Sequence, residues 1–259
     1  MSLIERLGIV NWDFSDKLKS VESDIAHLEA NVLMTEQRRN ERCLFDRLTA
    51  LQYSYLLGLV NKIPDLYCPL IANVRAVYGP HCRGNKRQSD LVNVTWNLEV
   101  EVVACWAVVI GDVSAQSSLG LFDIDGNDPS EMTDESQRIS TRMFLSALRR
   151  DAESIARDMA LLTKARTSKA ARDRLYGSMI KAVVCDGDRD AIRSFLATWK
   201  KKYFNPVAPY HRFSYHATVL CHLYGITIDD PDLGLHIIDV PEAVKARARA
   251  AVATLDVKV

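Results

Sequence analysis

Acidic side chains gather in one stretch of this chain, and their type and spacing suit the binding of a positively charged partner. No Lys or Arg lies between Arg87 and Arg138, whereas ten Asp and Glu residues do. The candidate partner-binding residues are seven of these acids: Asp112, Asp123, Asp125, Asp128, Glu131, Asp134 and Glu135. Complementary charge speeds association and contributes to specificity. Segment 88–137 is therefore a candidate docking face for a basic partner.

The segment that follows the acidic one has an excess of positive charge. Residues 138–202 contain 16 Lys and Arg against seven Asp and Glu. The acidic segment and the basic helices could therefore face one another, or both could be solvated surface. The sequence leaves these alternatives to the docking face open.

Two acidic turns resemble calcium loops, but their spacing favours other roles. In residues 123–128 the glycine, Gly126, is fourth, whereas an EF-hand loop places it sixth and ends on a Glu. The second turn contains Asp186, Asp188 and Asp190 between two helical patterns, where Asp188 or Asp190 is expected to cap the following helix. We therefore predict no metal site at either turn.

Catalytic and cofactor motifs are missing from the sequence. His211, His216 and His222 are spaced by five and six residues, which does not place their rings on one helical face as a zinc helix requires. There is no GxGxxG, P-loop or GxSxG pattern. We assign no catalytic residue, metal ligand or cofactor, and we expect no enzyme.

The composition is that of an ordinary globular protein. The chain has 259 residues and a mass of 29.1 kDa, is 48% hydrophobic, and has 33 basic and 33 acidic residues. Balanced charge gives no net field for nucleic acid or anionic lipid, so we expect neither partner. The longest apolar run, 102–110, is about nine residues, which is too short to span a bilayer. The six cysteines are scattered singly, which favours reduced thiols and a cytoplasmic location.

Helical periodicity dominates the N-terminal third. Apolar residues recur at three and four positions from Leu18 to Val32, with Ser15 as the expected N-cap. A second run covers 44–59 and stops before Pro64, and a third covers 66–78 and stops at Gly79. These patterns predict N-terminal helices within residues 15–80.

The pattern of the next segment, 90–111, is compatible with both a strand and a helix. Residues 92–102 alternate apolar and polar, which is typical of a strand, but a single strand would lack partners. We favour a largely buried helix here, with minor irregular or strand structure possible around 90–130. Residues 114–135 contain several Gly and Pro and are predicted to be a loop.

The basic C-terminal half, 138–259, is predicted to be helical throughout. The expected helices cover the following residues: 138–162, 170–184, 190–203, 211–224 and 242–255. Together these patterns predict an all-α fold, with residues 1–259 forming a single domain built as an array or bundle of helix–turn–helix pairs.

Residues 178–240 resemble the immunity 49 family of polymorphic-toxin systems. The resemblance lies in a helix from Ile180, an acid–Gly–Asp turn at 186–188, a second helix, the basic segment 199–203 and a helix that ends at Gly225 before an acidic turn. It covers about a quarter of the chain. The family has no agreed catalytic residues, so none is transferred.

The resemblance implies a mainly α-helical antidote in the bacterial cytoplasm. Such a protein binds one cognate toxin, blocks it by stoichiometric occlusion and so protects the producing cell. A basic nuclease-type toxin would suit the acidic segment 88–137. Two alternatives remain: a helical interaction or scaffold protein, phage-derived or regulatory, and an enzyme whose site cannot be recognised from sequence.

Overall fold

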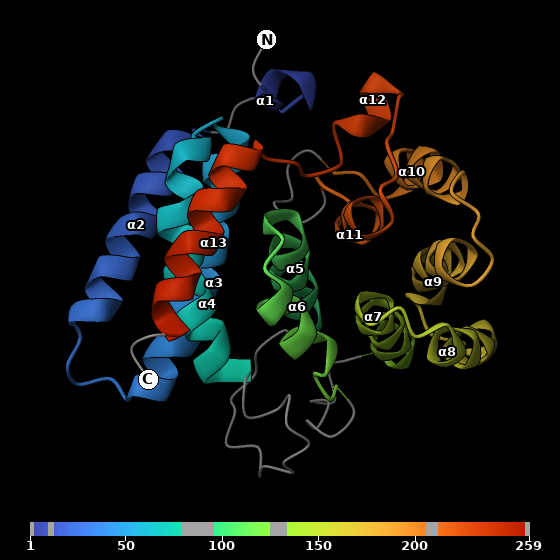
Figure 1. The fold of residues 1–259 in the computed structure, drawn as a ribbon, viewed down its shortest axis with the longest axis horizontal. Helices are drawn as coiled ribbons and strands as arrows, with labels where there is room; N and C mark the ends of the chain where they lie inside the picture. Colours follow the sequence, from blue (N-terminus) through green and yellow to red (C-terminus); the bar gives the residue numbers. More distant parts are fainter. Residues whose placement is uncertain (1–2, 10–12, 79–95, 125–133, 206–211, 257–259) are drawn as a thin grey trace. The chain divides into compact units, whose positions relative to one another are not determined.

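The protein is all-α, as the sequence predicted. The computed structural model describes residues 3–9, 13–78, 96–124, 134–205 and 212–256, and within these ranges every regular element is helical. Figure 1 shows the helices in chain order. No helix in the described ranges has both the length and the apolar character needed to cross a bilayer.

The chain divides into two compact units, and both are discontinuous in sequence. Unit 1 comprises residues 1–80, 110–112 and 239–259, and unit 2 comprises residues 81–109 and 113–238. The sequence showed no sign of this division, because both units are helical and no linker of distinct composition joins them. The single domain expected from the sequence stays a prediction.

Unit 1 is a helical bundle whose last helix comes from the C-terminal end of the chain. Its long helices are α2 (Phe14–Ala30), α3 (Glu36–Leu56), α4 (Ile63–Tyr78) and α13 (Glu242–Asp256), and its short ones are α1 (Leu3–Arg6) and the 3-10 turn η1 (Val60–Lys62). In Figure 1, α13 lies alongside α4, and these two helices contact each other extensively. Arg47 of α3 contacts Glu29 of α2 and Asn73 of α4, so one guanidinium joins three helices.

The start and end of α2 differ from the prediction. Asp13 is the N-cap, since its side chain accepts a hydrogen bond from the Asp16 amide at 3.0 Å, and Ser15 lies inside the helix. The helix ends at Ala30, so Val32 does not continue its apolar stripe and is 87% exposed. Apolar spacing alone could not show this, because Val32 is in phase with the preceding residues.

Helix α4 ends at Tyr78 as predicted, but it begins before Pro64. Proline is tolerated in the first turn of a helix because the amide it lacks has no partner there.

Residues 110–112 are held against the helices of unit 1 by side-chain hydrogen bonds. Tyr67 donates to Asp112 Oδ2 at 3.1 Å, and Arg249 donates to the Ile110 carbonyl at 2.8 Å.

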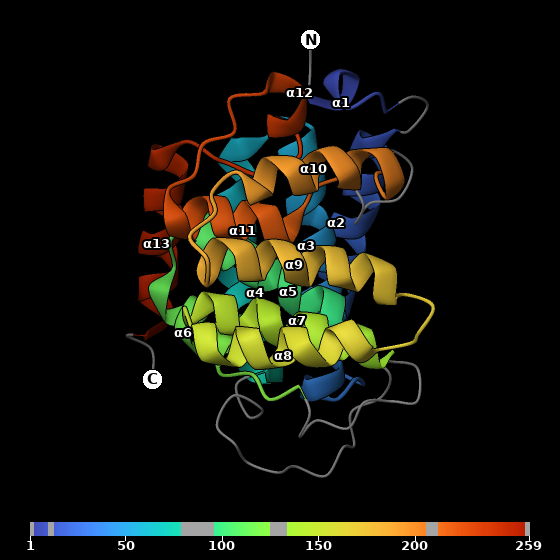
Figure 2. The same cartoon turned by 90° about the vertical axis from the view of Figure 1, so that its right-hand side faces the viewer.

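Unit 2 contains the helices from the middle of the chain. They are α5 (Trp96–Ile110), α6 (Val113–Gly120), α7 (Glu135–Leu148), α8 (Ala152–Lys164), α9 (Ala170–Val184), α10 (Ala191–Lys202), α11 (Tyr215–Tyr224) and α12 (Pro231–Gly234). Helices α7, α8 and α9 contact one another, α10 contacts α9, and α11 contacts α7 and α9. Figure 2 shows α8, α9 and α10 side by side.

The choice of helix over strand is confirmed for residues 96–110. From Val100 to Ile110 every residue of α5 is buried. A helix buried on all sides needs no amphipathic stripe, so the alternation within residues 96–102 does not mark a strand. Within this buried stretch Glu101 is the one charged residue.

Three predictions in unit 2 need correction. Residues 114–120, expected in a loop, belong to α6. The helix expected over 138–162 is two helices, because Arg150 adopts a left-handed φ of 57° and Asp151 caps α8 through the Ser154 amide at 3.0 Å. The helix expected from residue 211 begins at Tyr215, capped by Ser214.

Candidate functional site

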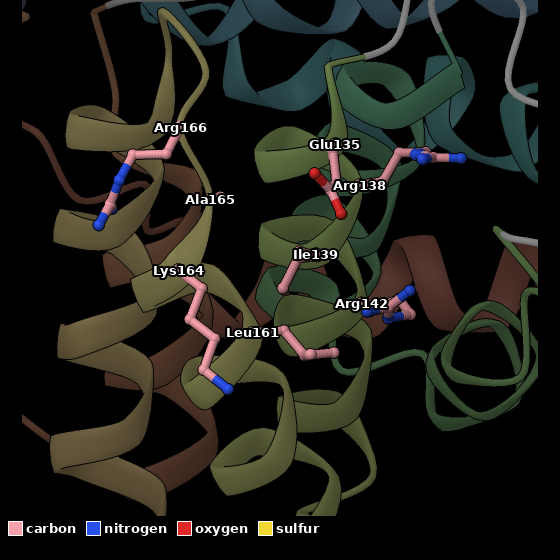
Figure 3. A pocket seen from close by; sticks show the side chains of 8 residues that line it. All are labelled: Glu135, Arg138, Ile139, Arg142, Leu161, Lys164, Ala165 and Arg166. Carbon is pink, nitrogen blue, oxygen red and sulfur yellow. The ribbon is translucent and has the colours of Figure 1, made fainter.

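A cationic groove lies between α7 and α8. It has a volume of about 480 Å³. Figure 3 shows the side chains that line it: Glu135, Arg138, Ile139, Arg142, Leu161, Lys164, Ala165 and Arg166. Four of these side chains are basic and one is acidic. The groove therefore offers a positive surface on the basic half of the chain.

The middle of the lining is apolar. Ile139 and Ala165 are buried, whereas Leu161 is 46% exposed. An exposed leucine between basic side chains provides apolar area that a ligand can cover. The groove thus combines charge with a hydrophobic contact.

The basic side chains of the groove differ in their existing partners. Arg142 forms a two-pronged pair with Asp158, whose carboxylate is almost fully buried, with contacts of 3.1 and 3.2 Å. Arg166 donates to the Thr163 carbonyl at 3.4 Å, and Lys164 is exposed. Arg138 Nε is buried and has no hydrogen-bond partner within the described part of the chain.

A network of buried polar side chains lies within unit 2, and it begins at the N-terminus of α7. Asp134 caps this helix by accepting from the Ser136 amide at 3.0 Å. Burial alone would raise the pKa of Asp134, but hydrogen bonds from Thr167 and Ser136 outweigh it, so this pKa is lowered. The carboxylate is therefore held in its charged form.

Ser136 connects this cap to α9. Its Oγ lies 2.8 Å from Asp134 Oδ1 and 2.6 Å from Asp173 Oδ2, and it accepts from Thr167 Oγ1 at 2.8 Å. One hydroxyl proton serves one carboxylate at a time. Asp173 is only 1% exposed and is paired with Arg172 at 3.0 Å.

A second buried group surrounds His216 of α11. Its ring stacks on Tyr176, and its Nε2 lies 3.6 Å from Glu101 Oε1. Glu101 accepts from Thr141 Oγ1 at 2.6 Å. Burial raises the pKa of Tyr176 to about 12, so its hydroxyl stays protonated at neutral pH. This group joins α5, α7, α9 and α11.

The acidic residues predicted to bind a partner do not share one environment. Asp112 is buried in unit 1, where Tyr67 donates to it. In unit 2, Asp123 is exposed, Asp134 is the cap of α7, and Glu135 lines the groove.

Several residues singled out by the sequence lie outside the described ranges: Asp125, Asp128, Glu131 and His211, and so does Cys82, one of the six cysteines. The docking face on segment 88–137 stays a prediction. Among the described residues, no cluster of His, Cys, Asp and Glu could hold a metal ion. Cys43, Cys105 and Cys221 are buried free thiols.

The region that resembles the immunity 49 family forms a helix, a tight turn and a helix. Helix α9 ends at Val184, Gly187 adopts a positive φ of 71°, and α10 begins at Ala191. Asp190 is the N-cap residue of α10 but its side chain makes no capping hydrogen bond, whereas Asp188 Oδ1 accepts from the amides of residues 190 and 191 at 3.0 and 3.3 Å. Gly225 ends α11 in the left-handed conformation, as predicted.

The amino-acid sequence indicates the charge of the groove but not its location. The excess of Lys and Arg over residues 138–202 was visible. The groove depends on the break at Arg150, which turns the chain so that α8 packs beside α7. A single helix over 138–162 would not have brought Arg138 and Lys164 to the same groove.

Comparisons with protein-family models, curated proteins and solved structures each find no match for this chain. The resemblance to the immunity 49 family therefore rests on the residues described above.

Proposed function

We propose that this protein is an immunity protein, which binds one cognate bacterial toxin and neutralises it by stoichiometric occlusion in the cytoplasm of the producing cell. The observation that carries the proposal is the α7–α8 groove, which is lined by four basic side chains and an exposed leucine. Charge combined with apolar area is what a protein-binding surface requires. The helix–turn–helix of α9 and α10 agrees with the layout of the family.

Tight binding is the physical requirement of such an antidote. A few free toxin molecules can damage a cell, so the dissociation constant has to be nanomolar or lower, which corresponds to about −12 kcal/mol. Surface charge alone is screened by salt and does not supply this energy. The complex is therefore expected to survive high salt through its apolar contacts.

The experiment is co-purification of the tagged protein with the product of its neighbouring gene, followed by native mass spectrometry. The proposal predicts a one-to-one complex that persists in about 0.5 M salt, where the Debye length falls to a few ångströms. It also predicts that the chain restores growth to cells that express this gene product. A toxin that neither binds nor is neutralised would refute the proposal.

An exposed apolar turn in unit 1 favours a second candidate function, that of a helical scaffold protein. Between α2 and α3, Val32 is 87% exposed and Leu33 is 94% exposed. Contiguous exposed apolar side chains can mark a contact surface, and Val32 and Leu33 are adjacent in the chain. A scaffold would bind a partner that is not toxic, and the growth assay separates the two functions.

A further inference from the structure

We infer that the α7–α8 groove binds an acidic amphipathic segment of the partner protein, an inference that rests on the proposed function for the identity of that partner. The carboxylates of the segment pair with Arg138, Lys164 and Arg166. An apolar side chain of the segment covers Leu161.

The groove has a surplus of positive charge. Glu135 is the one acid in the lining, and Arg142 already has Asp158 as its partner. Arg138, Lys164 and Arg166 form no ion pair within the described part of the chain. A bound acidic segment would neutralise these unpaired positive charges.

Arg138 has a buried guanidinium nitrogen. Its Nε lacks a hydrogen-bond partner in the described structure although it is shielded from solvent. An unsatisfied buried donor costs about 1–3 kcal/mol. A carboxylate that reaches into the groove would accept from this guanidinium and recover part of that cost. Guanidinium groups bind carboxylates with two parallel hydrogen bonds.

The apolar part of the lining favours a peptide over a nucleic acid or free phosphate. Proteins that bind single-stranded nucleic acid stack its bases on aromatic side chains. The eight lining residues contain no aromatic side chain, and their exposed apolar member is Leu161. Phosphate would pair with the basic groups but leave this leucine uncovered. An acidic segment with one apolar face satisfies both features.

Arg142 fixes the shape of the groove and is not expected to contact the partner. It lies on α7, and its partner Asp158 lies on α8 with 2% exposure. A two-pronged ion pair of this kind holds the two helices in register. The groove is therefore preformed, which lowers the entropic cost of binding.

The inference is tested on the full chain with a fluorescein-labelled helical peptide that has one Glu-rich face and one Leu-rich face. Fluorescence anisotropy is expected to show binding to the wild type. The triple variant Arg138→Glu, Lys164→Glu and Arg166→Glu is expected to bind at least about tenfold more weakly, equivalent to about 1.4 kcal/mol.

The matched control reverses three charges on another helix of unit 2. In the variant Arg193→Glu, Lys201→Glu and Lys202→Glu, the net charge changes equally and all three positions are exposed on α10. It is expected to bind the peptide as the wild type does. Equal losses in the two variants would overturn the inference, because they would show that total charge alone governs binding.

Two further measurements test the contribution of Leu161 and the preference of the groove for a peptide over other ligands. Leu161→Asp is expected to weaken peptide binding by about tenfold, and an unchanged affinity would overturn the role of Leu161. A labelled single-stranded oligonucleotide or inorganic phosphate that binds the groove more tightly than the peptide would also overturn the inference.

The toxin complex distinguishes failure of this inference from failure of the proposed function. If the toxin is captured and neutralised equally by the wild type and the groove variant, the inference fails and the proposed function stands. If the peptide binds the groove but the neighbouring gene product neither binds nor is neutralised, the function fails instead. If the groove variant loses toxin binding and the control variant keeps it, both the inference and the proposed function are supported.

Discussion

Tyr176 and His216 lie face to face in the core of unit 2, with ring centroids 4.4 Å apart and planes inclined by 9°. Phe144 presents its edge to the same histidine at 4.8 Å. The Nε2 atom of His216 lies 3.6 Å from Glu101. Residues from α5, α7, α9 and α11 thus surround one imidazole. The side chains that contact it are aromatic (Tyr176, Phe144) and charged (Glu101).

Removing the hydroxyl of Thr141 tests the buried polar contacts. Thr141→Val keeps the shape of the side chain but removes the donor that lies 2.6 Å from Glu101. We expect the free energy of unfolding to fall by about 1.5–3 kcal/mol, because a buried carboxylate loses its partner. Urea unfolding of both proteins measures this. Thr163→Val is the control, since Thr163 is exposed, and an equally small effect in both would contradict the prediction.

Gly177 tests the close packing of α9 on its neighbours. A Cβ at this position would lie 2.7 Å from Leu162 Cδ2 and 3.1 Å from Met143 Sδ. Gly177→Ala is therefore expected to destabilise the protein by about 1–3 kcal/mol, although the same change in an exposed helix is stabilising. Chemical denaturation shows whether the free energy of unfolding falls or rises. Ser178→Ala, at an exposed position of α9, should change stability by less than about 0.5 kcal/mol, and a stabilising effect of Gly177→Ala would be inconsistent with this packing.

The lowered pKa of Asp134 predicts a pH-dependent contribution to stability. A carboxyl whose pKa is lower in the folded state stabilises the fold above its unfolded pKa, about 3.9, and loses this effect as the pH falls through the folded value. Asp134→Asn should therefore lower stability at neutral pH by about 1 kcal/mol or less, and the difference should shrink in acid. Thermal unfolding across this pH range measures it, with the exposed Asp229→Asn as control. A difference that stays constant with pH would show that the charge of Asp134 is not involved.

The acidic docking face predicted from the sequence has its own test. Reversing Asp123, Asp125 and Asp128 to Lys should weaken binding of the captured toxin and reduce its dependence on salt, if this segment contacts a basic partner. Binding by isothermal titration calorimetry at low and high salt measures both. The control reverses three acids elsewhere: Glu36, Asp65 and Asp229, each exposed. Unchanged affinity in the first variant would discard the acidic face and leave the α7–α8 groove as the contact surface.

Much of the fold could be predicted because its signals are local. The end of α11 follows from Gly225, which stops a helix by its own conformational preference, and the helical choice for 96–110 followed from the lack of partner strands. The break at Arg150 could not be predicted, because an arginine with a positive φ has no sequence signature. Asp and Ser both cap helices, so the sequence does not show whether Asp13 or Ser15 caps α2; the backbone geometry decides for Asp13.

The candidate site was less predictable than the fold. A charge count located the basic half of the chain but not the groove, since Arg138 and Lys164 meet only after the chain reverses between α7 and α8. The buried group around His216 was missed for a related reason. Its members come from four helices, and a histidine or glutamate on an apolar helix gives no sign of its partner.

The most direct test of the central claim is native mass spectrometry of the tagged protein purified together with the product of its neighbouring gene. The proposed function predicts a one-to-one complex that persists in about 0.5 M salt and a chain that restores growth to cells expressing that product. A gene product that neither binds the purified protein nor is neutralised by it in cells would contradict the proposal.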